Sequence, residues 1–259
     1  MTNATDERRV QNLLDRLGRA SEFGAQTVET ALKCGTEIVF SDGLGKAEGG
    51  FVPADADGGN KIVLNAAMND ARLMLALVRL SRTAQQTENV SAQMSVRDAV
   101  MTARAKTADA VAHEAAAAYE MRSTDPEAYQ AFFNKNMKVA GCYFYTRHES
   151  GNVAKAMNRA VEAWYDCPEK VAAADESVIT RMAGTAEKVA SSEMKPERLA
   201  KIFTHDGAPY VTAAFLKSEK ACFLSESQKD RIGNIEKFRR SSGLSGAAVK
   251  ASLTARFER

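Results

Sequence analysis

Arg79 and Thr83 lie one helical turn apart in the segment 77–86, whose apolar pattern predicts a helix. Side chains four residues apart on a helix point to the same side, which is the geometry that two histidines need to bind one zinc ion. Arginine has no lone pair to donate to a metal, and a neutral threonine hydroxyl is a poor zinc ligand. Leu80, beside Arg79, cannot move a proton. The spacing is therefore that of a metal site, but the residue types do not support one.

Histidine occurs only three times, at positions 113, 148 and 205. His113 and Glu114 repeat the first half of a zinc-binding H-E-x-x-H motif, but Ala117 stands where the second histidine belongs. A relocated metal site around His113, Glu114 and Asp109 is an alternative that the sequence disfavours, because catalytic zinc normally needs three protein ligands. The chain has no C-x-x-C pair and no G-x-S-x-G motif, so nucleophilic catalysis has no better support.

Three arginines, Arg72, Arg79 and Arg82, form the most specific remaining signal on the predicted helix. One interpretation is a groove that binds an acidic peptide or another anion. The interpretation that we prefer is structural, because a partly buried arginine needs a counter-charge. In that case Arg79 pairs with one of three acidic residues on the following helix: Asp98, Asp109 or Glu114.

A small sheet and a series of helices must position these residues. Three short β-branched or turn-bounded runs predict strands at 36–40, 49–53 and 61–65. The second is expected at a sheet edge, because Pro53 cannot donate to a strand ladder. The helix that carries the arginines begins at Asn69 or Asp70, either of which can cap it. Its core face is expected to hold Leu73, Leu77, Leu80 and Ala84.

Helices account for most of the remaining chain. Two short ones are predicted before the sheet, the first ending near Gly18 and the second spanning about 25–32. A long alanine-rich helix runs from Ser95 to about Arg122, and its small side chains let neighbours approach closely. Later helices begin at Pro126, Pro168 and Pro196, and others cover 153–165 and 212–224. Residues 139–145 could be a helix or a buried strand, and we prefer the helix. The loop 204–210 lies between the helix that begins at Pro196 and the helix at 212–224.

The length and composition of the chain fit one domain, or one domain with an appendage. The chain has 259 residues, of which 45% are hydrophobic and only 7% aromatic, a balance that favours helix. The net charge of +2 gives no whole-molecule reason to expect a nucleic-acid partner. Four scattered cysteines indicate reduced, mostly buried thiols. Residues 1–9 lack the apolar segment of a secretory signal and no run could span a bilayer, so a cytoplasmic protein without a membrane partner is expected.

The predicted fold class is α+β and mostly α, with a small three-stranded sheet packed on helices and additional C-terminal helices. Four segments are expected: N-terminal helices at 1–34, a core at 35–145, a helical extension at 146–224, and a weakly packed basic tail at 225–259. The tail is expected to be weakly packed because apolar residues thin out after Ser225 while lysines and arginines increase.

With this order of elements, residues 51–145 resemble a family of uncharacterised bacterial proteins named putative metallopeptidases. The segments that look similar are 50–53, 62–64, Leu77-Val78 leading into Arg82, Ala84 and Gln86, and further on 108–110, 118–120 and the 129–143 region. The resemblance implies a zincin-like core of the gluzincin branch, in which two histidines and an acidic residue hold zinc and a glutamate is the general base. Those roles fall on Arg79, Thr83, Thr107 and Leu80, none of which can perform them.

The resemblance and the residues together predict a catalytically inactive relative of a zinc metallopeptidase, acting as a binding or regulatory protein. No cofactor is expected, since zinc would be expected only with an intact motif. The partner is an unidentified protein or peptide. One alternative is a metal-dependent hydrolase with the relocated site described above. A second is a nucleic-acid adaptor that uses the basic tail, which is weakly supported because the tail lacks interleaved aromatic residues.

Overall fold

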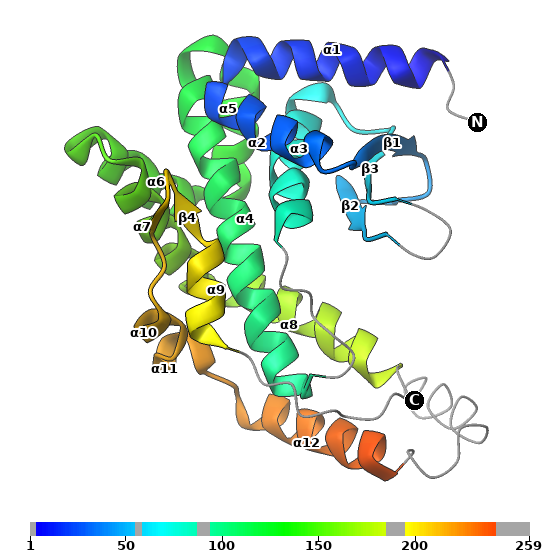
Figure 1. The fold of residues 1–259 in the computed structure, drawn as a ribbon, viewed down its shortest axis with the longest axis vertical. Helices are drawn as coiled ribbons and strands as arrows, with labels where there is room; N and C mark the ends of the chain where they lie inside the picture. The colour runs from blue at the N-terminus through cyan, green and yellow to red at the C-terminus, as the bar shows by residue number, and fades with distance from the viewer. Residues whose placement is uncertain (1–3, 55–58, 87–93, 185–194, 242–259) are drawn as a thin grey trace. The chain divides into compact units, whose positions relative to one another are not determined.

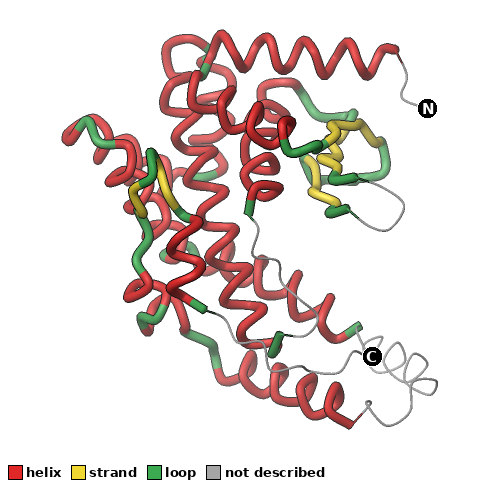
Figure 2. Tube along the Cα trace, in the orientation of Figure 1, coloured by secondary structure: helices red, strands yellow, loops and turns green. Residues whose placement is uncertain are grey.

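The computed structural model describes residues 4–54, 59–86, 94–184 and 195–241. Within these ranges the chain is mostly helical and carries one three-stranded mixed sheet and one two-stranded sheet (Figure 1, Figure 2). The predicted α+β class dominated by helices is confirmed. None of the described helices is long and apolar enough to cross a membrane.

Five strands and twelve helices are formed by the described residues. The strands are β1 (Glu37–Ser41), β2 (Gly49–Val52), β3 (Lys61–Asn65), β4 (Thr204–His205) and β5 (Ala208–Pro209). The helices are α1 (Ala4–Ala20), α2 (Glu22–Lys33), α3 (Asp70–Gln85), α4 (Val96–Thr124), α5 (Pro126–Lys135), α6 (Met137–Ser150), α7 (Val153–Tyr165), α8 (Pro168–Ala183), α9 (Pro196–Ile202), α10 (Ala213–Leu216), α11 (Glu219–Cys222) and α12 (Glu226–Ser241).

Two compact units make up the chain. Unit 1 comprises residues 1–87, 108–164 and 205–210, and unit 2 comprises residues 88–107, 165–204 and 211–259. The division falls within α4, so that its first part belongs to unit 2 and its second part to unit 1. The segments expected from the sequence follow chain order, whereas each unit gathers pieces that are distant in sequence.

The sheet of unit 1 has the strand order β1-β3-β2. The central strand β3 is parallel to β1, with Ile62 opposite Ile38, and antiparallel to β2, with Ile62 opposite Phe51. Ile62 and Leu64 are fully buried. The predicted edge position of the second strand is therefore confirmed.

Helix α3 packs against this sheet in unit 1. The side chain of Asn69 caps it by accepting a hydrogen bond from the Arg72 backbone N–H at 3.0 Å. Leu73, Leu77 and Leu80 are buried as predicted, whereas Ala84 is only half-buried. Most of the helix between residues 71 and 81 is enclosed, so its apolar surface is wider than a single stripe.

Unit 2 has its own apolar core, formed by residues of α4, α8 and α12. On α12, Ile232 and Ile235 are buried, and the fully buried Arg239 donates to the backbone oxygen of Met94 at 3.1 Å. The structure therefore differs from the weakly packed tail expected after Ser225, because two spaced isoleucines and a hydrogen-bonded arginine hold this helix in place. The rest of that predicted tail, 242–259, lies outside the described residues.

Several local predictions are confirmed, and others are corrected. Pro126, Pro168 and Pro196 occupy first turns of helices, and 139–145 is helical.

The single helix predicted at 212–224 is wrong. Helices α10 and α11 are separate, because the Ser218 hydroxyl accepts a hydrogen bond from the Ala221 N–H and starts a new helix. The loop predicted at 204–210 contains the β4–β5 hairpin. Helix α1 extends past Gly18, near which the sequence predicted its end. Of the four free cysteines only Cys167 is buried, so the prediction of mostly buried thiols is wrong.

Gly49 provides a test of how β2 packs. A Cβ added at this residue would lie 2.6 Å from the Val63 backbone oxygen and 2.9 Å from Leu80 Cδ1, whereas one added at Gly50 would meet nothing within 4 Å. We expect Gly49→Ala to lower the free energy of unfolding by about 1–3 kcal/mol through overpacking, and Gly50→Ala to change it by less than about 1 kcal/mol. Chemical denaturation of both variants measures this, and equal effects would contradict the packing.

Candidate functional site

The guanidinium of Arg79 lies between two buried carboxylates. Its Nη2 is 3.3 Å from Oε2 of Glu48, and its Nε is 3.4 Å from Oε2 of Glu114. The Arg79 side chain is 24% exposed, against 7% for Glu48 and 2% for Glu114. Of the three acidic partners considered from the sequence, the structure therefore pairs Arg79 with Glu114. Its second partner, Glu48, precedes β2 and was not anticipated.

Glu48 is surrounded by positive charge. Arg72 and Arg79 of α3 and Lys135 at the end of α5 all approach its carboxylate. Burial alone would raise the pKa of Glu48, but the charges of Lys135, Arg79 and Arg72 outweigh it and lower the pKa below its ordinary value. Glu48 is therefore ionised at neutral pH and forms ion pairs with side chains of two helices.

Asp109 on α4 is the centre of a second buried network. Its carboxylate accepts hydrogen bonds from Arg82 Nε at 2.6 Å, from Gln86 Nε2 at 2.7 Å and from the Tyr210 hydroxyl. Burial raises the pKa of Asp109, but Arg82 more than compensates and lowers it. Burial and the neighbouring Asp109 charge together raise the pKa of Tyr210, so the tyrosine stays protonated and donates. The carboxylate is thus satisfied by three donors.

His113 is buried one turn after Asp109. Its Nδ1 lies 3.0 Å from the Asp109 backbone oxygen, which can only accept, so Nδ1 carries the proton. Its ring packs near Phe23 and Tyr210, with centroids 5.4 and 6.3 Å away. Burial, followed by the nearby Arg82 charge, lowers the pKa of His113 to about 4. The imidazole is therefore neutral at pH 7.

The other positions singled out in the sequence have local roles. Leu80 is buried and packs on Gly49 of β2. The Thr83 hydroxyl donates to the Arg79 backbone oxygen at 3.0 Å, a bond within its own helix. Thr107 is half-buried on the part of α4 that belongs to unit 2.

The three arginines expected as one cluster are divided between the two networks. Arg72 and Arg79 share Glu48, whereas Arg82 turns to Asp109. No isolated positive groove is formed by the three, since each has a carboxylate partner. Arg72 remains exposed beside Glu48, as does Lys135.

The donors at this site do not fit a zinc centre. Within the described ranges, no three His, Cys, Asp or Glu side chains are grouped so that they could hold a metal ion. Glu48, Glu114 and Asp109 each face a guanidinium, which competes with a metal for the same oxygens. The relocated site around His113, Glu114 and Asp109 gains no support from this geometry.

Sequence reasoning missed Glu48, Lys135 and Tyr210. Glu48 lies 31 residues before Arg79, and Tyr210 follows Asp109 by 101 residues. No periodicity connects such positions. The one available signal was physical: a partly buried arginine requires a counter-charge, but that requirement does not say where in the chain the counter-charge lies.

The depressed pKa of His113 predicts a specific acid sensitivity. Between about pH 6.5 and 4 the unfolded chain binds a proton at this residue and the folded chain does not, so stability falls as pH falls through this window. We expect the free energy of unfolding to fall by about 2 kcal/mol more in the wild type than in His113→Gln between pH 7.5 and 5. Urea denaturation at both pH values measures this. The control is His148→Gln, at an exposed histidine; the same loss in all three proteins would contradict the prediction.

Comparison with known proteins identifies a family. No curated protein and no solved structure matches the chain. Residues 1–200 of the 259 match the family model described as "Putative metallopeptidase family (DUF6782)". The match includes the whole region on which the resemblance was based, together with α3, β1–β3 and α4. The chain therefore belongs to the putative metallopeptidase family DUF6782.

Proposed function

We propose that this chain is a catalytically inactive member of its family and acts as a binding or regulatory protein. The observation that carries the proposal is the guanidinium of Arg79 held between Glu48 and Glu114. Arg79 stands where the resemblance puts the first zinc-binding histidine. The proposal includes a zincin-like core, which the order β1, β2, β3, α3, α4 supports.

A cation fixed at this position opposes metal binding in two ways. It repels a second cation electrostatically, and it uses the carboxylate oxygens that could otherwise act as ligands. Moving Arg79 out would leave the buried Glu114 without this counter-charge, which is costly in a protein interior. The arrangement therefore stabilises the scaffold and competes with a metal.

The position of the general base is also occupied by a residue without acid–base chemistry. Leu80 is buried against β2, so it neither contacts a substrate nor activates water. Thr83, at the second histidine position, donates within α3. Substituting one residue would not restore the missing groups.

A binding role is supported by the exposed charge beside the site. Arg72 and Lys135 are exposed, and together with Arg79 they place three cations around Glu48. Under the proposal, an acidic segment of a protein or peptide partner competes with Glu48 for the exposed Arg72 and Lys135. The nucleic-acid alternative relies on residues after Ser225, where Ile232, Ile235 and Arg239 of α12 are used for packing.

Metal content tests the proposal directly. Purified without added metal or chelator, the wild-type chain should contain far less than one zinc per chain by elemental analysis, because the motif positions offer no ligand pair. A chain with Arg79→His and Thr83→His restores two histidines at i and i+4, so it should retain more zinc and serves as the positive control.

One tightly bound zinc per wild-type chain would overturn the proposal. If a peptidase activity were also abolished by chelators and by His113→Ala, the relocated site would be correct instead. A wild-type chain without zinc or chelator-sensitive activity supports an inactive relative.

A further inference from the structure

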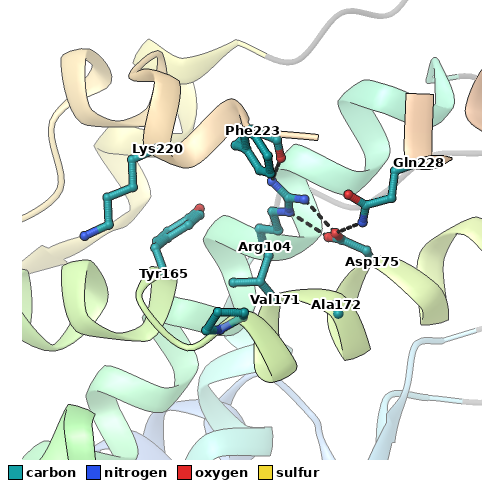
Figure 3. A pocket seen from close by; sticks show the side chains of 9 residues that line it. Arg104, Tyr165, Val171, Ala172, Asp175, Lys220, Phe223 and Gln228 are labelled. Atoms are coloured by element: carbon teal, nitrogen blue, oxygen red, sulfur yellow. Dashed lines mark hydrogen bonds and ion pairs between the residues drawn. The ribbon is translucent and has the colours of Figure 1, made fainter. Parts of the chain in front are cut away.

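Unit 2 contains a cavity that is separate from the ion networks described above. It has a volume of about 280 Å³ and lies between α4, α8, α11 and the start of α12 (Figure 3). All the residues that line it belong to unit 2. Its size is at the lower end of that of ligand pockets, which suits a small molecule.

The floor of the cavity is a saturated polar network. Arg104 is buried, and its Nε and Nη2 each lie 2.6 Å from a carboxylate oxygen of Asp175. Nη1 donates to the Phe223 backbone oxygen at 2.7 Å, and Gln228 donates to Asp175 at 2.6 Å. Figure 3 shows these side chains converging on one carboxylate. The network fixes the shape of the floor and neutralises its charge.

The walls of the cavity are apolar. Pro168, Val171 and Ala172 lie on one face of α8 and line the cavity. The rings of Tyr165 and Phe223 line it as well. Phe223 is 62% exposed, and among the described residues it is the large hydrophobic side chain of unit 2 that is most open to solvent. An exposed aromatic ring beside an apolar cavity gives an apolar ligand a further surface to cover.

Lys220 supplies the available positive charge. It lines the cavity, and its Nζ lies 2.7 Å from Asp166 just before α8. The two side chains are 39% and 45% exposed, and ion pairs this exposed contribute little to stability. A ligand carboxylate could therefore replace Asp166 at small cost.

We propose that this cavity binds a small apolar carboxylic acid. The apolar part of the ligand lies against Val171 and Phe223, and its carboxylate pairs with Lys220 in place of Asp166. The neutralised floor does not compete for the anion, since Arg104 is held by Asp175. This binding site is independent of the function proposed for unit 1.

Titration of the full chain with 3-phenylpropanoate, followed by NMR, tests the proposal. We expect saturable shifts with a Kd below about 1 mM, and binding of 3-phenylpropanamide at least about tenfold weaker, because the amide lacks the charge. Lys220→Ala should weaken binding of the acid about tenfold and leave binding of the amide unchanged. Asp166→Asn should tighten binding of the acid several-fold by releasing Lys220.

Lys217→Ala is the matched control, since Lys217 is an exposed lysine of unit 2 that pairs with Glu197 and does not line the cavity. It should leave the Kd of the acid unchanged. An unchanged thermal midpoint in each variant shows that the fold is kept. The proposal is overturned if acid and amide bind equally, if the acid shows no binding up to about 10 mM, or if Asp166→Asn weakens binding of the acid.

Discussion

The contact on which the rest of unit 1 depends is the pairing of arginines on α3 with buried carboxylates. Arg79 faces Glu48 and Glu114, and Arg82 faces Asp109. Removing one partner of such a buried pair typically costs about 3–5 kcal/mol, because the remaining charge stays in a low-dielectric interior. These pairs therefore fix how α3 faces α4 in unit 1. Under the proposed function, the pairs with Glu48 and Glu114 also give Arg79 a structural reason to remain at the position of a former metal ligand.

The family to which the chain belongs and the chemistry that it performs are separate questions. Family membership follows from the match over residues 1–200. Chemistry depends on a few side chains, and under the proposed function the motif positions carry a paired cation, a core leucine and a threonine bonded within its helix. A scaffold can be retained for its packing while its site is converted to another use. Under the proposed function, the charged surface beside Glu48 is what remains for recognition.

Much of the fold was predictable, because apolar periodicity and capping residues are local signals. Asn69 marks the start of α3, Pro53 marks the edge strand, and the leucines of α3 mark its buried face. The contribution of Glu48 and Tyr210 was not predictable, because a buried charge can recruit partners from any distance along the chain. Helix α12 was underestimated since two isoleucines and one hydrogen-bonded arginine are a sparse pattern. The cavity of unit 2 depends on how α8 and α11 meet, which no single segment encodes.

The most direct measurement of the central claim is a crystal structure of the full chain grown with excess zinc, with anomalous diffraction recorded at the zinc edge. The account predicts no zinc peak beside α3, with the Arg79 guanidinium still between Glu48 and Glu114. A zinc peak within about 2.2 Å of an oxygen of Glu48, Glu114 or Thr83, with Arg79 turned away, would contradict it.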